Sequence, residues 1–360
     1  MTPHGDSGSV SSLCRLDQKG YLMRLLFRYF LLCAICTCSA SPSFVVSAEY
    51  TGFKRLLVTD PVSGKAMDAV YFYPGVAAEK TPSTIGPYQI AAQKALNIVP
   101  GRYPVIVISH GNAGSLWSHH DLATTLARQG NIVITLTHPG DNYKDQTGAG
   151  AISSWYGRPL QISAVITAAI NDVEIAQYID KDKIAFVGFS AGGATGLLLR
   201  GGNIDAGRYE NYCRKYGMNA ICSNKGVIIN DHPGLVVHLD SRIKAWVFMA
   251  PVSMAFSPGS LRRVIAPTLI FTGDKDEELS WEENARELAT TLAAEKEFQV
   301  IHNAGHFVFL SPCSAQLNKL APAICNDAPG VNRDDIHTAI NGEISEFLSK
   351  AWLKVKEPRV

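Results

Sequence analysis

The sequence carries almost no net charge, with 33 Lys and Arg residues against 32 Asp and Glu residues. Such a balance gives no support for nucleic-acid binding, which normally needs a basic surface. Long hydrophobic runs are also missing, because the apolar stretch from Tyr29 to Cys38 is shorter than the roughly 20 residues that cross a bilayer. No Pro/Ser-rich linker or repeat divides the chain after residue 48, so we expect one domain with insertions over residues 49–360.

The amino end has the pattern of a secretory signal peptide. Arg24 and Arg28 precede the apolar stretch, and Val46-Ser47-Ala48 offers a small-x-small cleavage pattern. We therefore expect residues 1–48 to be removed, which leaves a mature chain without a membrane span in the periplasm or the medium of a bacterium. A permanent amino-terminal anchor is the alternative.

The start of this segment is unusually long and polar. The residues before Met23 extend the charged part well beyond its usual length. We hypothesise that translation begins at Met23.

Four of the eight cysteines remain after such a cleavage, at Cys213, Cys222, Cys313 and Cys325. An even number in an exported protein indicates disulfides. Of the three possible connectivities, we favour Cys213 with Cys222 and Cys313 with Cys325, which closes short loops in surface insertions, over free buried thiols. The four contain no C-x-x-C pair, which argues against zinc.

Apolar runs of strand length alternate with helical patterns along the mature chain. Strands are expected at Phe53–Val58, Ala69–Tyr73, Val105–Ser109, Ile132–Leu136, Ile184–Val187, Ala245–Met249, Thr268–Phe271 and Phe298–Ile301. Helices are expected at about 119–129, 160–179, 193–199, 280–294 and 334–353. Strand, helix and strand at this spacing predict right-handed βαβ units, and hence an α/β fold with a mostly parallel, doubly wound sheet.

Three polar residues are expected to be helix N-caps. Ser118 has Asp121 three residues later, Ser280 has Glu283 three residues later, and Asp334 stands at the start of the last expected helix. Residues 75–100 show no sustained period and are expected to form a long loop with a short helix. Residues 201–240 also break the alternation, and we expect a cap-like insertion over the carboxyl edge of the sheet.

The stretch Gly188-Phe189-Ser190-Ala191-Gly192 follows the expected strand Ile184–Val187 directly. A strand, a tight turn with small residues on either side of a serine, and a helix together form the nucleophile elbow. Glycines are needed there because strand and helix cross too closely for a Cβ. Ser190 is therefore the candidate nucleophile.

Two further side chains complete a catalytic triad in the order nucleophile, acid, base: Asp276 and His306, each just after an expected strand. A neutral serine is a poor nucleophile, so His306 must accept its proton while Asp276 orients the imidazole. Asp274 is the alternative acid, and Asp231 a more distant one.

An oxyanion hole needs two backbone N–H groups, and we assign these to Ala191, after the nucleophile, and to Asn112, in the loop after an earlier strand. His110 is expected to fix that loop. The run His119-His120-Asp121 has the composition of a metal site, but neighbours on a helix point about 100° apart and cannot converge on one ion.

Motifs spread over most of the mature chain resemble the α/β-hydrolase superfamily, in particular its exported bacterial branch related to dienelactone hydrolases and platelet-activating-factor acetylhydrolases. They are Tyr71-Phe-Tyr-Pro74, Ser109-His-Gly-Asn112, His138-Pro-Gly140, Arg158-Pro159, Gly188-Phe-Ser-Ala-Gly192, Gly273-Asp-Lys-Asp276 and Ala304-Gly-His-Phe307. The loop from Cys313 to Cys325 resembles the disulfide loop of that family. True dienelactone hydrolases have a cysteine nucleophile where this chain has Ser190, which points to a carboxylesterase, lipase-like enzyme or acetylhydrolase instead.

The resemblance implies Ser190, Asp276 and His306 as the triad, Asn112 and Ala191 as oxyanion donors, and no cofactor. The expected activity is hydrolysis of short to medium acyl esters or lipid acetyl esters, with a small-molecule or lipid ester as the substrate. An acyltransferase with the same triad is an alternative. A non-catalytic binding protein on the same fold is another.

Overall fold

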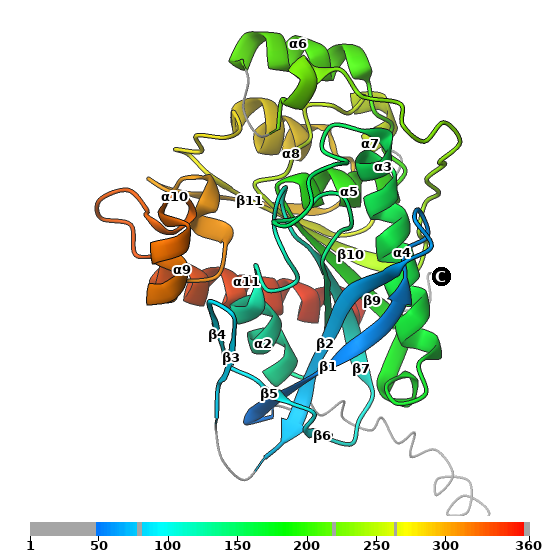
Figure 1. Cartoon of the computed structure of the whole chain (residues 1–360), viewed down its shortest axis with the longest axis vertical. Helices are drawn as coiled ribbons and strands as arrows, with labels where there is room; N and C mark the ends of the chain where they lie inside the picture. Colours follow the sequence, from blue (N-terminus) through cyan, green and yellow to red (C-terminus); the bar gives the residue numbers. More distant parts are fainter. Residues whose placement is uncertain (1–47, 78–80, 218–220, 263–264, 356–360) are drawn as a thin grey trace, which may run out of the picture. The chain divides into compact units, whose positions relative to one another are not determined.

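The computed structural model describes residues 48–77, 81–217, 221–262 and 265–355, which fall in one compact unit (Figure 1). The expected signal peptide, with Met23, lies outside the described residues apart from Ala48, its last residue. Among the described helices, none combines the length and the apolarity that a bilayer crossing requires.

The strands of the described residues form one ten-stranded sheet and a separate two-stranded one. They are β1 (Tyr50–Thr59), β2 (Ala66–Val76), β3 (Ser83–Ile85), β4 (Tyr88–Ile90), β5 (Gln93–Lys94), β6 (Asn97–Ile98), β7 (Tyr103–Ser109), β8 (Ile132–Leu136), β9 (Ile179–Phe189), β10 (Ile243–Met249), β11 (Thr268–Gly273) and β12 (Lys296–Ile301). In the large sheet the order is β12-β11-β10-β9-β7-β8-β2-β1-β5, with β6 beside β2.

The large sheet is antiparallel at one edge and parallel elsewhere. β1 and β2 form an antiparallel hairpin, whose turn is closed by Asp60, since its carboxylate accepts hydrogen bonds from the N–H groups of Val62 and Ser63. β2 runs antiparallel to β8, and the strands from β8 to β12 pair in parallel. The predicted mostly parallel sheet is confirmed.

Helices cover both faces of this sheet. The described helices are α2 (His120–Arg128), α3 (Ile152–Trp155), α4 (Gly157–Asn171), α5 (Ala191–Leu199), α6 (Ala206–Tyr216), α7 (Pro258–Leu261), α8 (Glu287–Thr291), α9 (Ala315–Leu320), α10 (Pro322–Cys325) and α11 (Arg333–Val355). Apolar residues of α2 and α11 pack on one face, and those of α4, α5 and α8 pack on the other (Figure 1). The sheet is thus doubly wound, as predicted.

Strand β7 shows how the sequence builds the two layers. Its side chains alternate, so that Val105 and Val107 belong to the core beneath α4 and α5, whereas Ile106 and Ile108 belong to the core beneath α2 and α11. All four are buried. A continuous apolar run is therefore needed for a strand that is covered on both sides.

The expectation of a helix within residues 75–100 is wrong. This segment forms the short strands β3 to β6, of which β5 and β6 extend the large sheet beside β1 and β2. Gly86, at φ +56°, makes the tight turn between β3 and β4. β5 and β6 form because their backbone groups pair with those of β1 and β2. Such pairing with a distant strand leaves no pattern in the local sequence.

The helix expected over residues 160–179 is shorter and starts earlier. α4 ends at Asn171 because Asp172 turns the backbone to an extended conformation, and its carboxylate accepts hydrogen bonds from the N–H groups of Glu174 and Ile175. After a short 3₁₀ turn, β9 already begins at Ile179. An aspartate that caps the following turn has ended the helix.

Two of the three expected N-caps are wrong. Ser118 accepts a hydrogen bond from the N–H of Ser115, and α2 begins at His120 without a side-chain cap. Asp334 lies inside the first turn of α11, where its N–H donates to Asn332.

At the third position the hydroxyl of Ser280 accepts the expected hydrogen bond from the N–H of Glu283, but the residue at the cap position is Trp281, one residue later than predicted. The helix there begins as a π-helical turn, Glu282–Arg286, and α8 ends at Thr291 instead of Ala294.

The segment 201–240 interrupts the alternation, as expected, but it contains a helix that the sequence pattern did not predict. Helix α6 is capped by Asp205 and joined to the following turn by a disulfide between Cys213 and Cys222. A second disulfide joins Cys313 to Cys325 across α9 and α10. Both bonds have the predicted sequence-local pairing.

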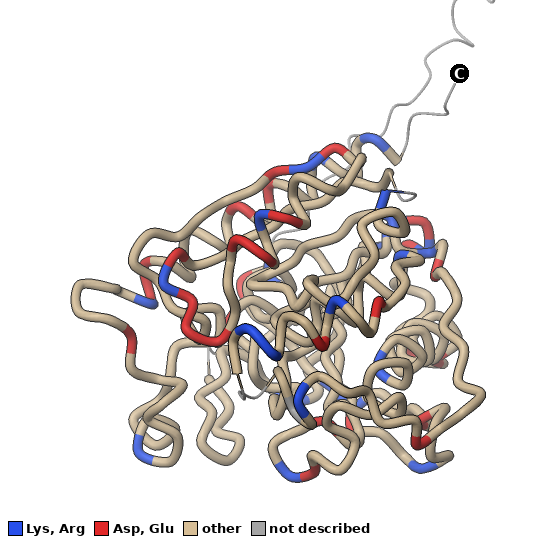
Figure 2. The backbone as a smooth tube through the Cα atoms, turned by 90° about the horizontal axis from the view of Figure 1, so that it is seen from above, with Lys and Arg blue, Asp and Glu red and all other residues tan. Residues whose placement is uncertain are grey.

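Basic and acidic residues are interspersed along the described part of the chain, as Figure 2 shows. Several pair across elements, such as Arg208 with Glu287 and Lys215 with Glu283, which tie α6 to the helical turns around α8. These pairs are exposed or half-exposed, so water and salt screen them and each contributes little to stability.

Candidate active site

Ser190 occupies a sharp turn between β9 and α5, in a backbone conformation that is rare for a residue with a side chain (φ 53°, ψ −116°). Its N–H donates to the carbonyl of Met249 on the neighbouring strand, which holds the turn in place. A Cβ at Gly188 would collide with the carbonyl of Gly192, and one at Gly192 would collide with the carbonyl of Ser109. The two glycines are therefore required by close approach of backbone, and the strain is concentrated at the serine.

The structure brings Ser190, His306 and Asp276 together at the carboxyl ends of three strands. The Oγ atom of Ser190 lies 2.9 Å from Nε2 of His306, and Nδ1 of His306 lies 2.7 Å from Oδ2 of Asp276. The side chains of His306 and Asp276 are 3% and 1% exposed. This chain of contacts has the geometry in which an imidazole can take a proton from a hydroxyl while a carboxylate orients it.

The three aspartates considered for the acid position have different partners. Asp276 also accepts hydrogen bonds from the N–H groups of Glu278 and Leu279, which fix its carboxylate. Asp274 bonds instead to the ring of the exposed His302 and to the N–H of Asn303. Asp231 accepts a bond from the N–H of Ser153, so that only Asp276 among the three contacts His306.

Asn112 and Ala191, the expected oxyanion donors, line one cavity of about 50 Å³. Asn112 follows β7 and Ala191 begins α5, so the two approach from either side of the elbow. The start of a helix places unpaired N–H groups and positive potential at this position.

The wall of that cavity includes apolar side chains that the sequence did not single out. Tyr209 of α6 and Ile221 come from the segment 201–240, and Tyr209 packs edge to face against Trp155 at 5.3 Å between ring centroids. Tyr209 and Ile221 lack any local signal, because their position depends on how the segment 201–240 folds back over α5.

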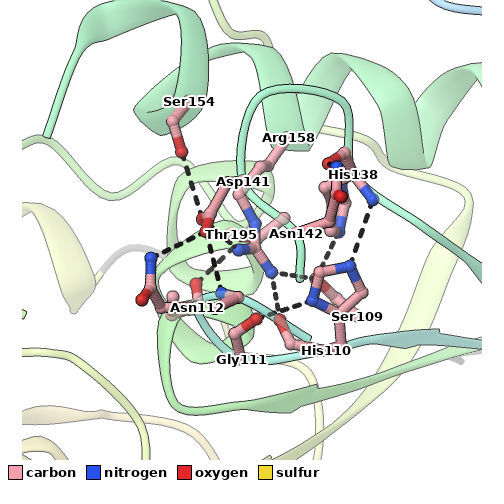
Figure 3. Close-up of polar contacts among 12 residues, drawn as sticks. Ser109, His110, Gly111, Asn112, His138, Asp141, Asn142, Ser154, Arg158 and Thr195 are labelled. Atoms are coloured by element: carbon pink, nitrogen blue, oxygen red, sulfur yellow. Dashed lines mark hydrogen bonds and ion pairs between the residues drawn. The ribbon is translucent and has the colours of Figure 1, made fainter. Parts of the chain in front are cut away.

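A buried ion pair forms the polar side of the same cavity. Nη1 of Arg158 lies 2.6 Å from Oδ2 of Asp141, with side chains 3% and 4% exposed (Figure 3). Burial would raise the pKa of the Asp141 carboxyl, but the charge of Arg158, together with smaller contributions that include the hydrogen bonds from Ala113 and Arg158, keeps that pKa below its ordinary value. The pair thus remains ionised inside the protein.

Two neutral histidines surround this ion pair. Burial, and then the nearby charge of Arg158, lower the pKa of His110 to about 3 and that of His138 well below its ordinary value. The ring of His110 accepts a bond from the N–H of His138 and contacts the carbonyl of Gly111 (Figure 3). His110 therefore fixes the loop after β7, as expected from the sequence.

The run His119-His120-Asp121 points its side chains to separate partners. The ring of His119 contacts the carbonyl of Phe309, while Asp121 accepts hydrogen bonds from Ser311, His337 and Asn341. Within the described residues, no three His, Cys, Asp or Glu side chains are grouped in a way that would hold a metal ion.

A larger cavity, about 750 Å³, lies away from Ser190. It runs along β1 and β2 and is bordered by Trp117 and by the loop around Tyr143. Neither Ser190 nor His306 lines either cavity, but the smaller one is lined by Ala191, which directly follows the candidate nucleophile in the chain, and by Asn112.

No family model matches the chain, and no curated protein matches it. Among solved structures, a ferulic acid esterase from Streptomyces cinnamoneus is similar, with 14% sequence identity and a TM-score of 0.59. The match covers 86% of this chain and 92% of the other. At this identity the likeness shows the fold, an α/β-hydrolase fold with a mainly parallel central sheet.

Proposed function

We propose that the chain is a serine hydrolase that cleaves carboxylic esters through an acyl-enzyme. Ser190 attacks the ester carbonyl, His306 takes the serine proton and returns it to the leaving alcohol, and Asp276 orients the imidazole. The N–H groups of Ala191 and Asn112 stabilise the oxyanion that forms. Water then releases the acid by the same relay.

The observation that carries this proposal is the continuous contact from Ser190 through His306 to Asp276, at 2.9 and 2.7 Å, on a strained elbow. Strain at a buried serine is costly, by about 1–3 kcal/mol, and persists where function needs it. The similarity of the fold to an esterase supports an ester rather than another acyl substrate.

The size of the cavity favours a short acyl group. A cavity of about 50 Å³ is well below the roughly 150 Å³ that accommodates a benzene ring. We therefore expect acetyl and butyryl esters, including lipid acetyl esters, to react faster than the aromatic acyl esters suggested by the name of the structural neighbour.

We also propose that residues 49–360 form a single exported domain in which residues 201–240 cap the cavity. The two disulfides support an oxidising location, and Tyr209 and Ile221 in the cavity wall support the cap. Intact mass of the secreted protein tests the cleavage after Ala48.

The test of the activity is hydrolysis of p-nitrophenyl acetate and butyrate by the mature protein, with Ser190→Ala as the matched variant. We expect wild-type hydrolysis that persists in EDTA, is abolished by a fluorophosphonate, and falls by about 10⁶-fold in kcat in Ser190→Ala. Hydrolysis that survives this substitution would show that Ser190 is not the nucleophile. A wild type that neither hydrolyses esters nor reacts with the fluorophosphonate would favour a binding protein.

A further inference from the structure

The loop that carries Asn112 is held by side chains from two other segments. The carboxylate of Asp141 accepts a hydrogen bond from the Asn112 side chain at 2.7 Å and another from the N–H of Ala113 at 3.1 Å, both at Oδ1 (Figure 3). On the preceding side, Nη2 of Arg158 donates to the carbonyl of His110. The ion pair therefore holds the loop on both sides of the Asn112 N–H.

This loop needs such support because its backbone is strained. Ala113 has φ +54°, a left-handed conformation that a residue with a Cβ rarely adopts. A free loop would relax by rotating its peptides, and such a rotation would change the direction of the Asn112 N–H. The Ala113 N–H belongs to the peptide that follows Asn112, so its bond to Asp141 fixes that peptide and limits rotation about the backbone of Asn112.

Arg158 also reaches the other half of the candidate oxyanion hole. Its Nε donates to Oγ1 of Thr195 at 3.1 Å, and the same hydroxyl donates to the carbonyl of Ala191 at 3.1 Å. One guanidinium is thus bonded to the loop before Asn112 and, through the hydroxyl of Thr195, is linked to the carbonyl of Ala191 at the start of α5. A planar, rigid fork with several donors suits this bridging role better than a single ammonium group.

Every nitrogen of Arg158 is bonded within the protein, and the partners are Thr195, Asp141, Ser109 and His110. Asp141 is bonded at both oxygens, to Asn112 and Ala113 at one and to Arg158 and Ser154 at the other. Because both side chains use their hydrogen-bonding atoms within the protein, they act on the substrate through the backbone whose position they fix.

We propose that Arg158 and Asp141 are positioning residues that set the distance and direction of the two oxyanion donors, Asn112 and Ala191. The inference rests on the proposed function, because an oxyanion must form for its donors to matter. This role differs from that of the triad, because neither Arg158 nor Asp141 is bonded to Ser190, His306 or Asp276.

The first test is Asp141→Asn, which keeps the shape and removes the charge and one strong acceptor. Since a donor displaced by about 1 Å can cost about 10²-fold in rate, we expect kcat to fall by about that factor while KM stays within about threefold. Rates are taken per active site, counted with a fluorophosphonate, so that misfolded protein does not contribute. The pH profile of kcat/KM should keep its wild-type shape, because the contacts among Ser190, His306 and Asp276 are retained.

Arg158→Lys tests the bridge itself. Lysine keeps the positive charge next to Asp141 but cannot bond to His110 and Thr195 at once, so kcat should fall by at least about tenfold. Full activity in this variant would mean that charge alone is sufficient, and it would overturn the bridging role.

The matched control is Asp327→Asn in the pair that Arg333 forms with Asp327, which is also largely buried, at 6% and 13% exposure. Its loss should lower thermal stability and leave kcat per active site within about twofold of the wild type. Should Asp141→Asn fail to fold, Asn112→Ala keeps the backbone N–H and removes only its side-chain bond to Asp141, and kcat should fall by about three- to tenfold.

The outcomes separate the two proposals. Hydrolysis that depends on Ser190 but is unchanged in Asp141→Asn, or a loss found entirely in KM, overturns the positioning role and leaves the proposed function intact. A wild type without Ser190-dependent hydrolysis overturns both.

Discussion

Asp274 and Asp276 illustrate how two residues of one loop come to differ in role. The side chain of Asp276 is 1% exposed and contacts His306, whereas that of Asp274 is 25% exposed and faces the exposed ring of His302. A buried carboxylate can orient an imidazole and stabilise its charge, because water does not compete for it. An exposed one is screened and contributes little.

Substituting each aspartate by asparagine tests this difference. Asp276→Asn should lower kcat by about 10⁴-fold, since the amide favours the wrong imidazole tautomer, while Asp274→Asn should change kcat by less than about threefold. Ester hydrolysis at saturating substrate measures both. Equal losses in the two variants would contradict the assignment of Asp276.

The sequence was sufficient to expect Ser190, Asp276 and His306 near one another, because each follows a strand and parallel strands end at one edge. The sequence was not sufficient to place Tyr209 or Ile221 in the cavity wall, because they reach the cavity only through tertiary folding. Arg158 had a detectable signal, since it is the only charged residue in the apolar helix from Gly157 to Asn171. A lone buried charge of this kind requires a partner.

At the scale of elements, α11 is joined to α2 by a polar contact inside an otherwise apolar interface. The ring of His337 contacts Oδ2 of Asp121 at 2.6 Å through Nδ1 and the carbonyl of Val308 at 2.7 Å through Nε2. Two acceptors require both ring nitrogens to donate, as in the protonated imidazole. Burial lowers the pKa of His337, but the hydrogen bond to Asp121 and its charge outweigh that effect and raise the pKa above its ordinary value.

This contact predicts a pH dependence of stability. A raised pKa in the folded state means that the contribution of His337 is fully present below its unfolded pKa of about 6.5, and is lost as the pH rises through the folded pKa. The free energy of unfolding in urea should therefore decrease as the pH rises above about 6.5. In His337→Gln, which cannot carry a charge, this decrease should be smaller, and an unchanged slope would contradict the prediction.

Element boundaries show which local patterns were decisive. Strands buried on both faces, such as β7 and β10, were predicted within about two residues, because an apolar run has few alternatives. The end of α4 was missed because Asp172 competes for backbone N–H groups. Helix α6 was missed because most of its surface is polar, and its stability depends on a disulfide and on ion pairs with distant helical turns.

At the scale of the molecule, the two disulfides should differ in their effect on the substrate. Cys222 is adjacent to Ile221 in the cavity wall, whereas Cys313 and Cys325 lie near α9 and α10. Each pair closes a short loop and should stabilise the fold by about 2–4 kcal/mol.

The prediction is that the double variant Cys213→Ser/Cys222→Ser raises the ratio of butyrate to acetate hydrolysis by at least about threefold, because the wall can move. Cys313→Ser/Cys325→Ser should lower the melting temperature and leave that ratio unchanged. A change of the ratio in both variants, or in neither, would contradict the role of Ile221. The mature wild type, denatured, should show no free thiol.

The separation of the site along the chain has a consequence for biosynthesis. Ser190 and His306 are 116 residues apart, and Asp276 lies between them. A nascent chain that ends before β12 contains the elbow and the loop of Asn112 but lacks His306, the base that contacts Ser190. Under the proposed function such an intermediate cannot hydrolyse esters, so hydrolysis begins only after synthesis has passed His306 and β12 has joined the sheet.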